Sequence, residues 1–251
     1  MTARAAYLLP LAVFMLVADG AAAQSLSAPG LEIRIDGGAA RPAEVATALK
    51  IVAVLTVLSL APALLMVMTA FTRIIVVLSL LRQALGMQDT PPNTVLVGLA
   101  LFLTLFTMQP VLTQIDSQAF QPYLDGAVGF EQAAQTALQP VREFMIRQTR
   151  EQDLMLMLEV SGSEPPNDLA EVRTVHLIPA FMLSELKTAF QIGFIIFLPF
   201  LLLDVVVSSI LMSMGMLMVP PMMISLPLKL LMFVLIDGWN IVVKALLGSF
   251  R

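Results

Sequence analysis

Four long apolar stretches dominate the pattern of hydrophobic and polar positions along the chain. They cover residues 45–82, 94–112, 188–218 and 222–247. Within the first, the block Arg73–Arg82 has an arginine at each end and apolar filling, so it is expected to extend the helix. Each stretch is comparable to the roughly 20 residues that a helix needs to cross a bilayer. The pattern predicts an all-α membrane protein whose hydrophobic helices occupy residues 45–112 and 178–251.

The N-terminal residues 1–23 have the pattern of a secretory signal peptide. Arg4 provides the positive region, an apolar run of about 13 residues follows, and small residues precede an expected cleavage between Ala23 and Gln24. The alternative is a retained first transmembrane helix, but the apolar run is too short to span. Residues 24–44 are then expected to form a flexible outer leader.

A polar region, residues 113–177, separates the second and third apolar stretches. Apolar residues recur in it at helical spacing, and Pro140 is expected at the first turn of one of its helices. Two or three amphipathic helices are predicted here, and Phe144 lies on one of them.

Between the third and fourth stretches, residues 212–221 combine alternating methionines with two prolines. The methionines occupy positions 212, 214, 216 and 218, and the prolines are Pro220 and Pro221. In an extended backbone, side chains two residues apart share a face, so the four methionines would line one side. Methionine is flexible and apolar, which suits a plug that gives way in a gated pore, although a buried methionine-rich turn is an equal alternative.

Composition excludes several function classes. Charged residues make up 13% of the chain, there is no cysteine, and His176 is the only histidine. An electrostatic nucleic-acid binder, a cysteine nucleophile and a histidine-based metal site or catalytic triad are therefore not expected. No enzyme motif stands out, so we expect neither an enzyme nor a cofactor.

Ionisable residues interrupt the third and fourth apolar stretches. Asp204, Lys229 and Asp237 lie inside them, and Glu185 and Lys187 stand at the start of the third. Charges at membrane depth are costly and normally face protein or a water-filled path. One interpretation is a proton relay or a polar pore lining. The favoured one is an interhelical pair of Lys229 with either Asp204 or Asp237, because polar partners also hold helices together in lipid.

Several sequence blocks resemble the FliP family of flagellar type III export-gate proteins. These blocks are Arg73–Val76 with Leu85–Gly86, Pro91–Asn93, Phe102–Pro110, Pro179–Phe194, Pro199–Asp204, Gly215–Pro221 and Asp237–Trp239. The resemblance covers nearly all of the chain after residue 23, and the 179–194 block is its most specific part. Relatives in virulence injectisomes share most of the blocks, and the signal peptide and outer leader favour the flagellar branch.

The resemblance implies a pore subunit that acts with other chains. It implies a homo-pentamer that joins FliQ-like and FliR-like membrane subunits and an FlhB-like switch subunit in the flagellar basal body of the bacterial inner membrane. Unfolded flagellar proteins would pass through the central channel. The helices would sit raised above the bilayer plane, which would account for their prolines and charges.

The resemblance also assigns roles to individual residues. Met216, Leu217 and Met218 would form a gasket around the closed channel, and many family members have methionine where this chain has Leu217. Met212, Met214, Gly215, Pro220 and Pro221 would support this gate loop. Glu185 is the leading candidate for an intersubunit polar contact, with Lys187, Asp204, Lys229 and Asp237 as further polar candidates. Phe144 is a candidate for a packing contact that supports assembly.

Two other function classes remain open on the residues alone. A proton- or ion-coupled transporter of small solutes would use Asp204, Lys229 and Asp237 as its relay and would function as a monomer or dimer. A membrane scaffold without a pore would tolerate polar replacement of Met216 and Met218 without ion leakage.

Overall fold

The computed structural model describes residues 26–28, 31–33, 42–163, 171–216 and 219–250. The chain divides into two compact units, residues 1–59 and 60–251. In the first unit, strand β1 (Leu26–Ala28) pairs antiparallel with β2 (Leu31–Ile33) inside the predicted leader. Helix α2 (Pro42–Val67) begins on a proline, whose fixed φ suits a first helical position, and its C-terminal residues belong to the second unit.

The first apolar stretch folds as two helices. Helix α2 ends at Val67 and helix α3 (Phe71–Ala84) begins after a turn, so the expected continuous helix over 45–82 is wrong. The side chain of Thr69 offers a reason, because its Oγ1 accepts a hydrogen bond from the Phe71 N–H at 3.4 Å. Threonine hydroxyls compete in this way with the helical hydrogen-bond ladder. Residues 73–82 are nevertheless helical, as predicted.

Three further segments are apolar helices. Helix α4 (Asn93–Ile115), a π-helical turn η1 (Asp116–Phe120) and α5 (Gln121–Leu124) follow one another directly, and α8 (Thr174–Ser213) is the longest helix described. Helices α9 (Pro221–Leu235) and α10 (Gly238–Gly248) are bent by 67° at Asp237, whose φ is 53°. Among the described residues, Asn93–Leu124 and Thr174–Ser213 are long and apolar enough to cross a membrane, with the bent pair as a possible third span. Four spanning helices are thus not established.

The polar region between these segments folds as amphipathic helices, as predicted. They are α6 (Phe130–Gln148) and α7 (Glu151–Val160). Helix α6 runs straight through Pro140, so the expectation of a helix start at this proline is wrong. The buried positions Ala133, Pro140 and Phe144 belong to one continuous face. Burial of that face outweighs the backbone hydrogen bond that proline cannot donate.

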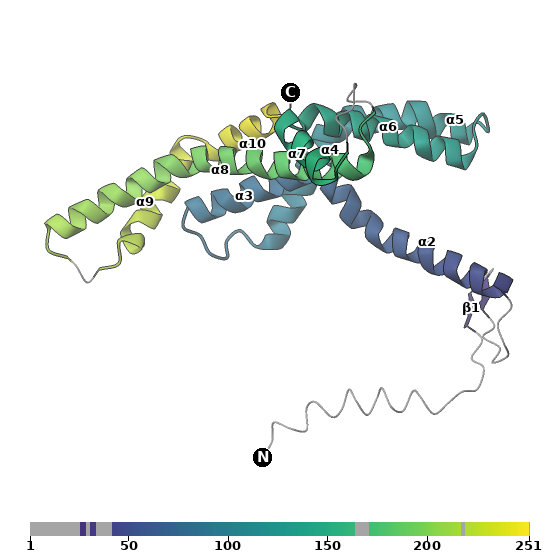
Figure 1. Cartoon of the computed structure of the whole chain (residues 1–251). Helices are drawn as coiled ribbons and strands as arrows, with labels where there is room; N and C mark the ends of the chain where they lie inside the picture. Colours follow the sequence, from purple (N-terminus) through teal and green to yellow (C-terminus); the bar gives the residue numbers. More distant parts are fainter. Residues whose placement is uncertain (1–25, 29–30, 34–41, 164–170, 217–218, 251) are drawn as a thin grey trace, which may run out of the picture. The chain divides into compact units, whose positions relative to one another are not determined.

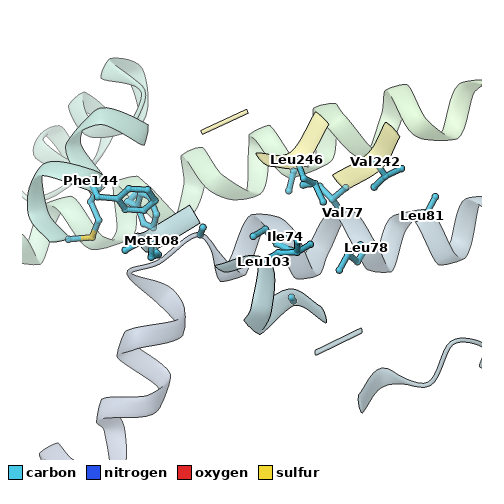
Figure 2. Packing of buried hydrophobic residues seen from close by; sticks show 14 of the residues in the cluster. Ile74, Val77, Leu78, Leu81, Leu103, Met108, Phe144, Val242 and Leu246 are labelled. Carbon is cyan, nitrogen blue, oxygen red and sulfur yellow. The ribbon is translucent and has the colours of Figure 1, made fainter. Parts of the chain in front are cut away.

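The core of the second unit forms around α8. Helices α3, α6, α7 and α9 all pack against it, and Figure 1 shows α8 as the long green helix with α3 and α9 alongside. Figure 2 shows part of the buried cluster, in which Ile74 and Val77 of α3 meet Leu103 of α4 and Leu246 of α10. At about 1.5 Å per residue, α8 is about 60 Å long, twice the roughly 30 Å of a hydrocarbon core. Helix α8 is therefore longer than a single perpendicular crossing of a bilayer requires.

A glycine sets the distance between α3 and α8. A Cβ built on Gly193 would lie 2.3 Å from Cδ1 and 3.2 Å from Cβ of Leu80. Even alanine at position 193 would therefore require the Leu80 side chain to move aside. This contact fixes the position of α8 beside α3 for the side chains described next.

Candidate functional sites: the Arg73 site and the methionine turn

A buried polar site lies at the point where four segments meet. We call it the Arg73 site, and it consists of Arg73 of α3, Gln148 of α6, Glu185 of α8, and Ser249 and Phe250 after α10. Arg73 is 2% exposed and Glu185 is fully buried. Arg73 donates from Nε to Glu185 Oε2 at 2.8 Å and from Nη2 to Oε1 at 2.5 Å, which is the two-pronged geometry that arginine and carboxylate favour.

The remaining donors of Arg73 are also used. Nη1 donates to the Ser249 carbonyl at 2.7 Å and to its hydroxyl at 3.0 Å, and Nη2 donates to Gln148 Oε1 at 3.0 Å. These five bonds match the five N–H donors of a guanidinium. The ring of Phe250 covers the guanidinium, with Cζ 3.8 Å from the ring centroid. A buried charge this completely paired holds its neighbours in one arrangement, because losing any partner leaves a donor unsatisfied.

Aromatic packing continues the Arg73 site towards α6. The ring of Phe144 lies 6.0 Å from that of Phe181 and 6.4 Å from that of Phe250, centroid to centroid. Phe144 is 4% exposed, and Figure 2 shows it beside Met108. Phe144 therefore packs inside the chain, and its role in supporting assembly stays a prediction. Both carboxylate oxygens of Glu185 likewise accept hydrogen bonds from Arg73 of the same chain, and an intersubunit contact of Glu185 stays a prediction.

The segment 179–194 also ties α8 to its other neighbours. Ser184 Oγ donates to Asp153 Oδ2 at 2.7 Å and accepts from the Arg150 N–H at 3.0 Å, which attaches the start of α7 to α8. Gly193, which lacks a Cβ, leaves room for Leu80 of α3. This short segment thus carries residues that position α3 and α7 beside α8.

A second ion pair lies farther along α8. Lys229 Nζ donates to Asp204 Oδ2 at 2.6 Å and to the Ala84 carbonyl at 3.2 Å, so it also caps the C-terminal end of α3. Of the two partners proposed for Lys229, the structure selects Asp204. Asp237 instead accepts a hydrogen bond from Asn240 Nδ2 at 3.0 Å and holds a left-handed conformation that aspartate tolerates.

Lys187 makes a different kind of contact. It is exposed and lines an apolar groove of about 850 Å³ on α8, together with Leu80, Phe190, Phe194 and Leu201 among others. The five polar candidates therefore separate into Glu185 in the Arg73 site, Asp204 with Lys229, and Asp237 and Lys187 on the surface.

The turn between α8 and α9 differs from its expected conformation. Met212 lies in the last helical turn of α8, and Met214 caps it in a helical conformation. Gly215 follows with φ 75°, where its N–H donates to the Met212 carbonyl and the Met216 N–H donates to Leu211. These two bonds form a Schellman cap, for which glycine has the required freedom. The extended backbone expected over 212–216 is therefore wrong.

We use the name methionine turn for Met212, Met214, Met216, Met222 and Met223. All five side chains are exposed, from 40% for Met216 to 72% for Met223. At about 1.5 Å per residue, Met212 lies about 40 Å along α8 from Glu185. Leu217 and Met218 of the predicted gasket, and the predicted cleavage site at Ala23 and Gln24, lie outside the described residues.

The part of the chain that the structure describes contains no group of three or more His, Cys, Asp or Glu side chains that could hold a metal ion. Its candidate sites are polar contacts between helices and an exposed apolar turn. Comparison with known proteins assigns the chain to a family. The sequence model of the FliP family matches residues 54–246, more than three quarters of the chain.

The chain belongs to the FliP family. It is 50% identical over 209 residues to the flagellar biosynthetic protein FliP of Bacillus subtilis, covering 83% of this chain and 95% of that protein. It is 45% identical over 248 residues to the FliP of Caulobacter vibrioides, covering 99% and 91% respectively. The FliP of Cereibacter sphaeroides is 52% identical over 202 residues, or 80% of this chain and 67% of that protein. Membership assigns this FliP-family chain to flagellar biosynthesis, and the names of these relatives mention no enzyme activity.

Sequence analysis did not identify Arg73 as the partner of Glu185. The signal that could have found it is that both charges stand in or beside apolar stretches, where an unpaired charge is costly. Gln148, Ser249 and Phe250 had no such signal, because serine, glutamine and phenylalanine are unremarkable near a helix end.

Proposed function

We propose that this FliP-family chain, a component of the flagellar export apparatus, is a pore-forming subunit of the export gate in the bacterial inner membrane. In this proposal the loop that contains Met216, Leu217 and Met218 seals the closed channel, and unfolded flagellar proteins pass when it opens. The observation that carries the proposal is the exposed methionine turn between two long apolar helices. Flexible apolar side chains can close around one another and separate without breaking specific bonds.

The exposed apolar faces of the chain support assembly into a larger complex. Large hydrophobic side chains are more than half exposed on α4, α8 and α9, for example Phe106 at 67%, Leu202 at 68% and Val234 at 73%. Faces of this kind are covered by lipid or by other chains. We propose a homo-pentamer that binds FliQ-like and FliR-like subunits, with an FlhB-like subunit and the basal body as further partners.

The internal contacts of α8 support a rigid subunit with one free end. The Arg73 site and the Asp204–Lys229 pair fix α8 to α3 and α9, whereas the methionine turn is held only by backbone caps in the described residues. A ring of such subunits would hold its helices still while the turns move at the centre. Residues 1–23 would be removed after directing the chain to the membrane.

The first test is the native mass of the detergent-extracted chain, alone and co-expressed with the two small membrane partners. We expect a ring of about five copies that takes up both partners, as the family resemblance implies. A monomer or dimer that takes up neither would contradict the proposal and favour the coupled transporter.

The second test addresses the seal directly. Met216→Ala together with Met218→Ala should allow ions to leak across the membrane while the ring still forms, because alanine leaves space where methionine filled it. Met155→Ala is the matched control, since Met155 of α7 is exposed but lies outside the methionine turn. Intact rings that remain ion-tight after the double substitution would contradict the sealing role.

A further inference from the structure

The methionines of this chain fall into two sharply different environments. Six of its seventeen methionines lie within residues 212–223, and the five of these that the structure describes are 40% to 72% exposed. Met145 is fully buried and Met108 is 4% exposed, both in the core around α8. Small reagents can therefore reach the methionine sulfur atoms at the turn but not those in the core.

Peroxides are reagents that oxidise methionine, and their reaction depends on whether the sulfur atom is exposed. The thioether sulfur attacks the peroxide O–O bond, forms an S–O bond and becomes a sulfoxide, while hydrogen peroxide is reduced to water. The step is reversible by methionine sulfoxide reductases, which return the thioether. A peroxide molecule is small and uncharged, so it can reach the exposed sulfur atoms of the turn.

Oxidation reverses the property for which the turn is suited. A methionine side chain is apolar and flexible, whereas its sulfoxide is polar and accepts hydrogen bonds. Sulfoxides packed together without donors would draw water between them, because a buried polar group without a hydrogen bond is costly. No donor side chain other than Ser213 stands among the described residues 212–216 of the turn.

We propose that the methionine turn is a site of reversible oxidation by peroxides, and that sulfoxide formation there makes the closed gate leak ions. The proposal rests on the sealing role proposed above. It predicts that oxidation acts through position in the turn, not through exposure alone. Met155 is 44% exposed on α7 and Met66 is 42% exposed near the end of α2, so their oxidation should leave the seal unchanged.

The test uses membrane vesicles from cells that produce the full chain with its export-apparatus partners. Vesicles are treated with hydrogen peroxide, ion leak is followed with a dye that reports the proton gradient, and each methionine is scored by peptide mass spectrometry for one added oxygen atom. We expect Met212, Met214, Met216, Met222 and Met223 to be oxidised before Met108 and Met145. The leak should rise with their oxidation and fall after treatment with methionine sulfoxide reductases.

Two variants separate position from exposure. Replacing all six methionines within residues 212–223 with leucine keeps apolar side chains of similar size but removes their sulfur atoms, so the peroxide-induced leak should be lost. Met155→Leu removes an exposed methionine elsewhere and should leave that leak unchanged. A six-leucine variant that leaks as much as the parent after peroxide treatment would overturn the proposal.

The remaining outcomes distinguish this proposal from the proposed function. Oxidation of Met145 as fast as the turn would overturn the inference and leave the sealing role untouched. A second result would also overturn the inference. This is the case in which vesicles with the oxidised parent chain do not leak, while vesicles with the Met216→Ala and Met218→Ala variant do. If neither oxidation nor the alanine substitutions cause leak, the sealing role itself is wrong, and the inference fails with it.

Discussion

The two ends of α8 differ in the kind of contact that their side chains make. Near its N-terminal end, Glu185 is fully buried and bound by Arg73, whose five donors are all used. The methionine turn begins at its C-terminal end, and the five methionines there are exposed and require no hydrogen bonds. Charge-assisted bonds fix one geometry, whereas methionine contacts tolerate many. One helix can therefore be anchored at one end and adaptable at the other.

The two ion pairs along α8 show where this rigidity declines. In the Arg73 site both partners are buried, and a ring covers the guanidinium. In the second pair, Lys229 is 7% exposed but Asp204 is 37% exposed, and Asp204 Oδ1 has no hydrogen-bond partner. The second pair is therefore less completely hydrogen-bonded than the Arg73 site, because Asp204 Oδ1 is buried without a partner while the rest of the Asp204 side chain is partly exposed. Along α8, the side-chain contacts are therefore most rigid at Glu185, less rigid at Asp204, and least constrained at the methionine turn.

Removing Glu185 should produce the largest effect. Glu185→Ala leaves the Arg73 charge buried without its carboxylate, so the free energy of unfolding should fall by about 3–5 kcal/mol. Lys187→Ala is the matched control two residues along the same helix, where an exposed side chain should matter by less than about 0.5 kcal/mol. Denaturant unfolding of the detergent-solubilised full chain measures both. Equal losses for the two variants would show that the Arg73 site does not anchor α8.

The close approach of α3 and α8 should give the next largest effect. Gly193→Ala places a Cβ against Leu80, which we expect to destabilise the chain by about 1–3 kcal/mol. Gly98→Ala in α4 is the control, because nothing lies within 4 Å of its Cβ position and alanine is the better helix former by roughly 0.5–1 kcal/mol. The two glycine variants should thus shift the thermal midpoint in opposite directions. A stabilising Gly193→Ala would contradict the packing of these helices.

The sequence predicted which segments are helical better than it predicted what they contact. The apolar stretches and the amphipathic helices α6 and α7 follow from the periodicity of apolar residues. The sequence left Asp204 and Asp237 as candidate partners of Lys229, and the structure shows Asp204 as the partner. Periodicity cannot give the partner of Glu185, because Arg73 lies 112 residues away and apolar helices have no polar face to orient them.

The methionine turn was mispredicted because two local signals compete there. Alternating methionines match the period of a strand, but Gly215 directly after an apolar helix is the usual sign of a Schellman cap. The helical conformation is favoured because the hydrogen bonds of α8 continue to Ser213, whereas a single extended segment would have no strand to pair with. The role of these residues in a pore needs other subunits and could not be derived from one chain's periodicity.

Neutralising Asp204 should have the smallest effect on stability and separates the gate from a transporter. Asp204→Asn keeps the shape and an acceptor for Lys229, and the carboxylate is more than a third exposed, so water screens the pair. We expect a loss of about 1 kcal/mol or less in unfolding free energy. Asp237→Asn, at an exposed position whose left-handed backbone asparagine also tolerates, should change less. Because a pore subunit needs Asp204 only to hold α9, rings should form and flagellar proteins should still be exported by the Asp204 variant. A proton-coupled transporter would need the charge itself, so intact assemblies that lose all transport would favour that alternative over an export gate.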